Sequence, residues 1–180
     1  TFNKIVIPKY LSHAFFIDGG SLGVENALKT AFDWKKRINL IKGNKKEGDK
    51  VIYFNQSFHG RSGYTLTLTN TSDPRKTMYF PKFPWFKVDN PKLRYPINDD
   101  VLNEVIVSEK NVINNIKNII KNNKDDIAAI IIEPIQGEGG DNHFRNEFMI
   151  NLRDICDNED IIFIFDEVQT GIGITGKMWA

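Results

Sequence analysis

The sequence predicts an α/β fold with a mostly parallel sheet and helices on both faces. Three short apolar runs lack polar alternation, as expected of strands covered on both sides: "VIYF" at 51–54, "IAAIII" at 127–132 and "IIFIF" at 161–165. Each run is preceded by a segment whose apolar residues recur at helical spacing. Alternating helices and buried strands of this kind are typical of a parallel sheet.

The helical segments each carry one apolar stripe. The stripes are Val24, Ala27, Leu28, Ala31 and Phe32 before the first strand, Val112, Ile116, Ile119 and Ile120 before the second, and Phe148, Leu152 and Ile155 before the third. The charged stretch 42–50 is interpreted as a solvated turn. Residues 74–96 hold five of the seven prolines, so we expect that region to be largely irregular.

Composition limits the function classes. The 180 residues are 41% hydrophobic and show no convincing internal boundary, which favours a single folded unit. The net charge of +1 gives no indication of nucleic-acid or membrane binding, and no run of about 18 apolar residues predicts a membrane span. A single cysteine, Cys156, excludes an internal disulfide and fits a reducing compartment, so we expect a cytoplasmic protein.

A Gly-Gly-Ser turn opens the first helix in "IDGGSLGVENALK", 17–29. Free backbone N–H groups at a helix start, together with the Ser21 hydroxyl, form a site for an anion such as phosphate. The glycines allow the backbone to approach that anion closely. The alternative is a plain turn in which Ser21 caps the helix. Neither the dinucleotide fingerprint nor the P-loop has this spacing.

The segment "FNQSFHGRSGYT", 54–65, follows the first strand. Phe58 could stack on a planar ring and Arg61 could bind a carboxylate through its forked guanidinium. The alternatives are a loop aromatic tucked into the core and a solvated arginine, and His59 taken alone is more often structural than catalytic. The three histidines, at 13, 59 and 143, form no metal-ligand cluster, so we expect no metal site.

Carboxylates follow the other two strands. Glu133 ends one buried run and Glu138 lies in the Gly-rich loop after it, which indicates either polar positioning of a ligand or simple loop solubility. Asp166 ends the third run, with Gln169 three residues later. A buried carboxylate is costly without a cationic partner, and a protonated ring nitrogen of a ligand would supply one. The alternative is a capping or surface aspartate.

Together these segments predict a ligand with a phosphate, a flat ring and a basic ring nitrogen, all of which pyridoxal 5′-phosphate has. Lys177 is an unsuitable nucleophile for such a ring, because it follows Asp166 too closely in the chain.

The ordered strings GGS…GVENALK, SFHGRSGYT, IIEPIQGEGGD and FDEVQTGIGITG resemble the class III pyridoxal-phosphate-dependent aminotransferases of fold type I. The longer strings "VENALKTAFDWK", "FHGRSGYTLTLTNT" and "DPRKTMYFPKF" resemble the lysine ε-aminotransferase branch. The resemblance covers nearly the whole chain and implies the large cofactor-binding domain of that fold.

The resemblance also implies roles for matching residues. For the cofactor, the resemblance implies that Gly20 and Ser21 bind the phosphate, Phe58 and Val168 contact the two ring faces, Asp166 pairs with the ring nitrogen and Gln169 binds the ring hydroxyl. His59 belongs to the same cofactor-binding set. Those for the substrate are Arg61 for an α-carboxylate, Glu133 as a pocket lining, and Glu138 as a gate that pairs with an arginine outside this sequence.

The implied reaction transfers the ε-amino group of L-lysine to 2-oxoglutarate, as a step of lysine catabolism in a homodimeric enzyme. The family's Schiff-base lysine follows the aspartate by roughly two to three dozen residues, whereas fourteen residues follow Asp166 here. We therefore expect residues 1–180 to be an internal fragment of the large domain, inactive alone, without the N-terminal segment, the lysine region and the small domain. The alternatives are an ornithine, acetylornithine or 4-aminobutyrate aminotransferase, or a non-catalytic binding module.

Overall fold

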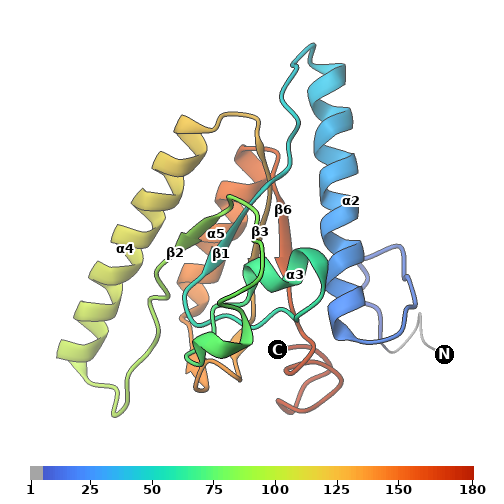
Figure 1. Ribbon diagram of the computed structural model, residues 1–180. Helices are drawn as coiled ribbons and strands as arrows, with labels where there is room; N and C mark the ends of the chain where they lie inside the picture. Colours follow the sequence, from blue (N-terminus) through green and yellow to red (C-terminus); the bar gives the residue numbers. More distant parts are fainter. Residues whose placement is uncertain (1–5) are drawn as a thin grey trace.

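A computed structural model describes residues 6–180 as three layers, with a central sheet between two groups of helices (Figure 1). The helices are α2 (Gly20–Ile41), α3 (Gly63–Leu68), α4 (Asp99–Asn122) and α5 (Asn146–Asn158), with a short 3-10 helix η1 (Pro74–Lys76). The strands are β1 (Lys50–Phe54), β2 (Phe86–Val88), β3 (Ile127–Ile132), β4 (Ile135–Gln136), β5 (Asn142–His143) and β6 (Ile162–Phe165).

The central sheet has the order β2-β1-β3-β6, and all its pairs are parallel. The chain moves from β1 outward to β2 and then returns to the other side of β1 at β3, so the winding reverses between β1 and β3. Ligands of such sheets bind beyond the carboxyl ends of the strands near this reversal. β4 and β5 form a separate antiparallel pair after β3.

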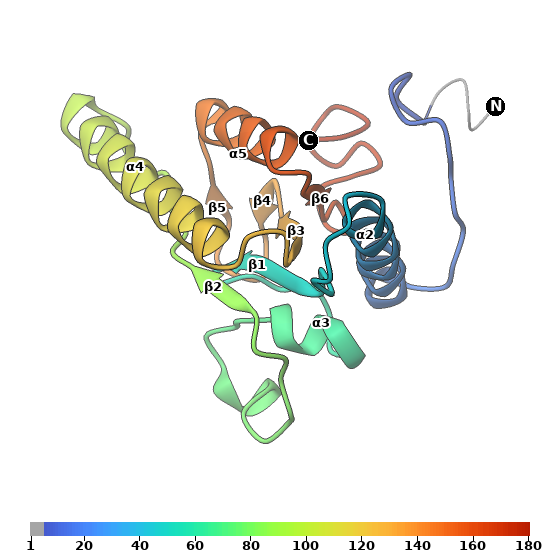
Figure 2. The same cartoon turned by 90° about the horizontal axis from the view of Figure 1, so that it is seen from above.

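Each face of the sheet has its own apolar core, because successive residues of a strand point to opposite faces. Viewed from above, α4 and α5 cover one face, while α2 and α3 cover the other (Figure 2). In β3, Ile130 and Ile132 pack toward α4 and α5, whereas Ala129 and Ile131 pack toward α2. Burial on both sides explains why these strands read as unbroken apolar runs.

The predicted α/β class with a parallel sheet is confirmed, and all three apolar runs are strands. The three helical stripes also lie on helices, namely α2, α4 and α5. Residues 74–96 are largely irregular as predicted, but β2 was missed. This strand has three residues and forms by pairing with β1, so no local sequence pattern predicts it.

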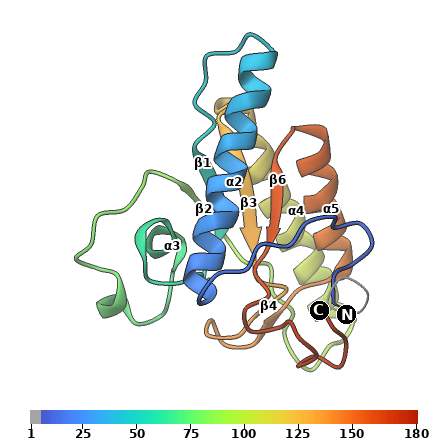
Figure 3. The same cartoon turned by 90° about the vertical axis from the view of Figure 1, so that its right-hand side faces the viewer.

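The carboxyl ends of the strands and the N-terminus of α2 meet at one edge of the molecule. Figure 3 shows the arrowheads of β3 and β6 pointing to the edge where α2 begins. This convergence places chain segments from four distant parts of the sequence together. Within residues 6–180, no helix has the length and apolar character needed to cross a membrane.

Candidate functional site

A cavity of about 180 Å³ lies at this edge, between the ends of β1, β3 and β6 and the start of α2. The residues that line it are Gly20, Ser21, Phe58, His59, Gly60, Glu133, Asp166, Val168 and Gln169. Eight of these nine are residues that the sequence singled out, and Gly60 is the addition. The fold therefore brings the predicted phosphate, ring and carboxylate segments into one small space.

Asp166 is buried at the end of β6, with an exposed fraction of 6%. Its Oδ2 lies 2.7 Å from His59 Nδ1, and its Oδ1 accepts a hydrogen bond of 3.1 Å from the Val168 N–H. The two donors stabilise a negative charge on the buried carboxylate, so Asp166 is not the surface or capping residue of the alternative interpretation. The partner within the chain is a histidine 107 residues away, which the sequence pattern did not reveal.

His59 is fully enclosed, and its Nε2 is buried without a hydrogen-bond partner. The imidazole therefore uses one nitrogen to hold Asp166 and leaves the other without a hydrogen-bond partner. This geometry gives His59 a structural contact inside the candidate site, so it is both a core histidine and a cavity residue.

Glu133 at the end of β3 is also buried, and its Oε2 accepts a hydrogen bond of 3.0 Å from the Phe58 N–H. Burial raises the pKa of this carboxyl to about 8, the Phe58 N–H opposes that rise, and the nearby charges of Asp166 and Glu138 add to it. Glu133 is thus protonated at neutral pH. Such burial also excludes the interpretation that Glu133 only makes the loop soluble.

The start of α2 carries the features of an anion site. Its N-cap is Gly19, which has a φ of 83° and offers no side chain to the first turn. Ser21 therefore does not cap the helix, and its Oγ instead accepts a hydrogen bond of 3.3 Å from the Arg61 N–H. A Cβ on Gly60 would lie 1.9 Å from this Oγ, so any residue other than glycine at position 60 would clash with the Ser21 hydroxyl.

Phe58 and Val168 supply apolar surface on the cavity, and Gln169 supplies a side-chain amide. Val168 packs on Gly20, where an added Cβ would come within 2.8 Å of its side chain. Gln169 packs on Gly137, where an added Cβ would meet Oε1 at 1.9 Å. Two glycines thus fix the side chains that face the cavity from the loop after β6.

Arg61 and Glu138, the other two predicted substrate residues, do not line this cavity. The Arg61 side chain is exposed beside Ser21. Glu138 is held by Thr71 and Lys76, two residues that sequence reasoning missed. Lys177 lines a separate cavity together with Pro134 and His143.

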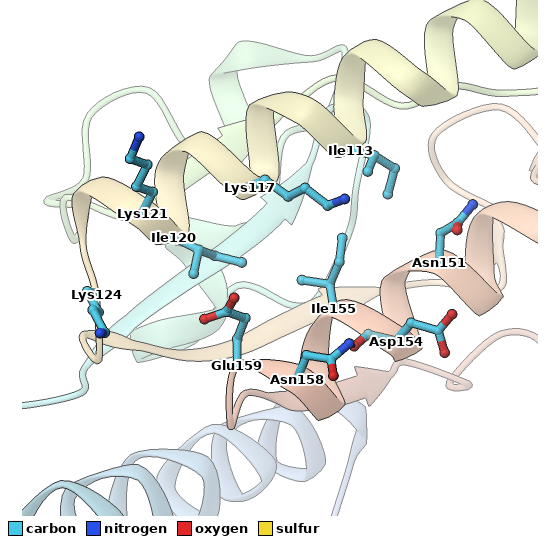
Figure 4. A pocket seen from close by; sticks show the side chains of 10 residues that line it. All are labelled: Ile113, Lys117, Ile120, Lys121, Lys124, Asn151, Asp154, Ile155, Asn158 and Glu159. Atoms are coloured by element: carbon cyan, nitrogen blue, oxygen red, sulfur yellow. The ribbon is translucent and has the colours of Figure 1, made fainter.

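A larger groove of about 610 Å³ lies between α4 and α5, on the outer side of the layer (Figure 4). Ile120 and Ile155 project into it, and Lys117 extends from α4 toward α5. Its polar lining is made of surface lysines, asparagines and acids, with no cluster of groups suited to a reaction. Within residues 6–180, no group of three or more His, Cys, Asp or Glu residues could hold a metal ion.

The residues that line the cavity fit pyridoxal phosphate in their chemistry. The helix start and Ser21 suit a phosphate, the Phe58 ring suits a flat ring, and the buried Asp166 carboxylate suits a protonated ring nitrogen. The glycine at position 60 supports this fit, because the close approach of Ser21 would be impossible with any side chain there.

The chain is similar to known aminotransferases over its whole length. The family model for class III aminotransferases matches residues 3–180. The chain is 46% identical to L-lysine-epsilon aminotransferase of Mycobacterium tuberculosis and 43% identical to that of Amycolatopsis lactamdurans, over 100% of this chain and 39% and 40% of those proteins. The chain therefore spans about two fifths of the length of these relatives.

The fold agrees as well. The structure of lysine aminotransferase from M. tuberculosis superposes with a TM-score of 0.93 at 45% identity, covering 99% of this chain and 40% of that one. The arrangement of strands and helices described above is thus shared with a solved structure.

Proposed function

Because the chain belongs to the class III aminotransferases, we propose that the whole protein is a pyridoxal-phosphate-dependent L-lysine 6-aminotransferase. It transfers the ε-amino group of L-lysine to 2-oxoglutarate and forms 2-aminoadipate 6-semialdehyde and glutamate. The observation that carries this proposal is the single cavity in which a phosphate site, two apolar faces and a buried carboxylate converge. The identity of the amino donor is supported by the likeness to the lysine ε-aminotransferases of two organisms.

The cofactor is held by residues of this chain. Gly20 and Ser21 bind the phosphate at the helix start, and Phe58 and Val168 enclose the ring. Gln169 donates a hydrogen bond to the ring hydroxyl. When bound, pyridoxal phosphate supplies an electron-withdrawing ring that accepts electron density from the reacting carbon.

Asp166 keeps the ring nitrogen protonated, and this proton makes the ring a strong acceptor of electrons. His59 fixes the carboxylate from one side and the Val168 N–H fixes it from the other. Neither donor needs to reorganise during the reaction, which is the condition under which electrostatic stabilisation is most effective.

Substrate recognition uses both a positively charged residue, Arg61, and acidic residues. Arg61 binds the α-carboxylate of lysine through its guanidinium, and the exposed side chain is free to reach it. Glu133 lines the pocket as a neutral acid. Glu138 acts as a gate that pairs with an arginine from another part of the whole protein. A residue that binds an α-carboxylate contributes to the binding of lysine and ornithine. It contributes nothing at the amine end of 4-aminobutyrate, which carries no α-carboxylate.

The unit described here is part of the large cofactor-binding domain. The Schiff-base lysine and the small domain belong to other parts of the whole protein, of which this chain is about two fifths by comparison with its relatives. The whole protein is a homodimer. The strongly exposed Tyr79 and Phe80, together with Met78, offer apolar surface for contacts beyond this unit.

The test is an assay of the purified full-length protein with 2-oxoglutarate and a panel of amino donors, with the products identified by mass spectrometry. We expect kcat/KM for L-lysine to exceed that for ornithine, acetylornithine and 4-aminobutyrate. A preference for one of the other donors would overturn the lysine assignment and leave the aminotransferase class intact. Absence of any transamination by the cofactor-loaded protein would overturn both.

A further inference from the structure

The dipeptide His59–Gly60 lies between the two ends of the candidate cofactor site. On one side, His59 Nδ1 lies 2.7 Å from Asp166 Oδ2. On the other side, Gly60 packs so closely on Ser21 that an added Cβ would lie 1.9 Å from its Oγ, and the N–H of the next residue, Arg61, donates to the same Oγ. The position of the dipeptide therefore affects both the proposed partner of the ring nitrogen and the proposed partner of the phosphate.

The buried hydroxyl group of Thr69 binds both residues of this dipeptide. Thr69 Oγ1 accepts a hydrogen bond of 3.0 Å from the His59 N–H and donates one of 2.6 Å to the Gly60 carbonyl. Thr69 has an exposed fraction of 2% and lies directly after α3, where its backbone is extended. It does not line the cavity, so its hydroxyl acts on the site through the dipeptide.

The residues on either side of Thr69 bind the preceding part of the same loop. Ser57 Oγ donates to the Leu68 carbonyl at 2.6 Å, and the Asn70 N–H donates to the Ser57 carbonyl at 2.8 Å. Asn70 Oδ1 also accepts a hydrogen bond of 3.1 Å from the Gln56 N–H. These contacts keep residues 68–70 in place beside the loop, so the Thr69 hydroxyl holds the dipeptide from a fixed position.

Loss of the Thr69 hydroxyl would release the dipeptide. A buried N–H and a buried carbonyl that lose their partner are costly, so the backbone at His59 and Gly60 would shift toward other partners or admit water. The phosphate and the ring nitrogen belong to one ligand, and their partners in the protein must therefore keep a fixed separation. A shift of the dipeptide would change that separation at both ends.

We propose that Thr69 is a positioning residue that sets the separation between the phosphate end and the ring-nitrogen end of the cofactor site. The inference rests on the proposed function, because it concerns binding of the proposed cofactor. The chain also offers a matched control in Thr67, which belongs to α3 and is equally buried. Its hydroxyl accepts a hydrogen bond of 3.0 Å from the Phe83 N–H, and neither residue lines the cavity.

The experiment titrates the full-length apoenzyme with pyridoxal phosphate and follows the absorbance. Thr69→Val replaces the hydroxyl by a methyl group of similar size, and we expect the Kd for the cofactor to rise roughly tenfold or more. Thr69→Ser keeps the hydroxyl and should stay within about threefold of the wild type. Thr67→Val should lower the melting temperature of the apoenzyme and leave the Kd unchanged, which separates loss of stability from loss of positioning.

Two fragments of the cofactor test whether both ends of the site are affected. Pyridoxal, which lacks the phosphate, reports on the ring end, and inorganic phosphate, used as a competitor of the cofactor, reports on the phosphate end. We expect Thr69→Val to weaken the binding of both fragments. Ser21→Ala provides the comparison, because it should weaken the binding of inorganic phosphate alone.

A wild-type Kd in Thr69→Val, a loss confined to one fragment, or an equal loss in Thr69→Ser would overturn the inference. If Thr69→Val does not fold, Thr69→Ala takes its place, because it also lacks the hydroxyl and adds no bulk, and the same outcomes decide. Cofactor binding by the wild type leaves the proposed function standing in each of these cases. Absence of cofactor binding by the wild type would instead overturn the proposed function.

Discussion

Two acids end neighbouring parallel strands and are equally buried, yet their surroundings differ. Asp166, after β6, is held by an imidazole and a backbone N–H, one on each oxygen. Glu133, after β3, has a single backbone donor, and burial raises its pKa to about 8. Two acids buried to a similar depth therefore differ in the number and type of donors that their oxygens accept.

The consecutive residues Phe58 and His59 create this contrast. The Phe58 N–H binds Glu133 and the His59 ring binds Asp166, so one dipeptide after β1 connects the ends of both other strands. Such an arrangement places two strand-end acids with different sets of donors in a single cavity. A ring with one basic nitrogen needs only one of them as a counter-ion.

The largest expected effect comes from removing the charge of Asp166. Asp166→Asn keeps the shape of the side chain but withdraws the counter-ion of the ring nitrogen. We expect kcat of the full-length enzyme to fall by about a hundredfold to a thousandfold, in line with the loss of other preorganised electrostatic contacts. Steady-state turnover with lysine and 2-oxoglutarate measures the effect.

The control for this change is Asp141→Asn, which alters an exposed aspartate of the loop before β5. We expect its turnover to match that of the wild type. If Asp166→Asn also turned over at the wild-type rate, the assignment of the charged acid would be wrong.

A smaller effect is expected from the partner of Asp166. In His59→Leu the carboxylate loses its imidazole donor, and we expect cofactor affinity to fall by about tenfold to a hundredfold, since a hydrogen bond to a buried charge contributes about 1.5–3 kcal/mol. In His59→Asn the amide can replace the Nδ1 donor, so cofactor affinity should stay close to that of the wild type. Titration of the apoenzyme with cofactor, followed by absorbance, separates the two variants.

Equal affinity in His59→Leu and the wild type would show that the Val168 N–H alone suffices for Asp166. A loss of the same size in His59→Asn and His59→Leu would assign His59 a packing role without a part in holding the charge.

The sequence predicted the ends of the strands well and the contacts between them poorly. Asp166 and Glu133 were recognisable because each follows an unbroken apolar run, and such runs report burial locally. The contact of His59 with Asp166 spans 107 residues, and no spacing rule connects them. Only the order of the strands in the sheet brings the end of β1 beside the ends of β3 and β6.

The same reason explains the missed residues. Gly60 matters because of Ser21, which approaches it from the start of α2, and a glycine in a loop has no signature for such a contact. Lys76 stands in the proline-rich stretch that was predicted only to be irregular, and its partner Glu138 lies 62 residues away. Irregular segments have no periodic pattern, so their role depends on the tertiary structure.

The smallest expected effect on activity concerns Glu133. Because Glu133 is protonated at neutral pH, Glu133→Gln imitates its native state and keeps an acceptor for the Phe58 N–H. We expect cofactor affinity and turnover at pH 7 to change by less than about threefold, since no charge is lost and the hydrogen bond is kept. Glu133→Leu, which lacks the acceptor, should reduce cofactor affinity further.

The charge state of Glu133 is visible in the stability of the protein. The folded state holds this proton up to a pKa of about 8, whereas the unfolded chain releases it near the ordinary value of 4.5. The folded state therefore binds more protons between these two values, and its stability falls as the pH rises through that window. Glu133→Gln removes this contribution, so the melting temperature of the variant should decline less than that of the wild type between pH 5 and about 8.

The exposed Glu47 provides the control, because Glu47→Gln should leave the pH dependence unchanged. Parallel melting curves for wild type and Glu133→Gln would mean that Glu133 is charged in the folded state, and the contrast with Asp166 would then be lost.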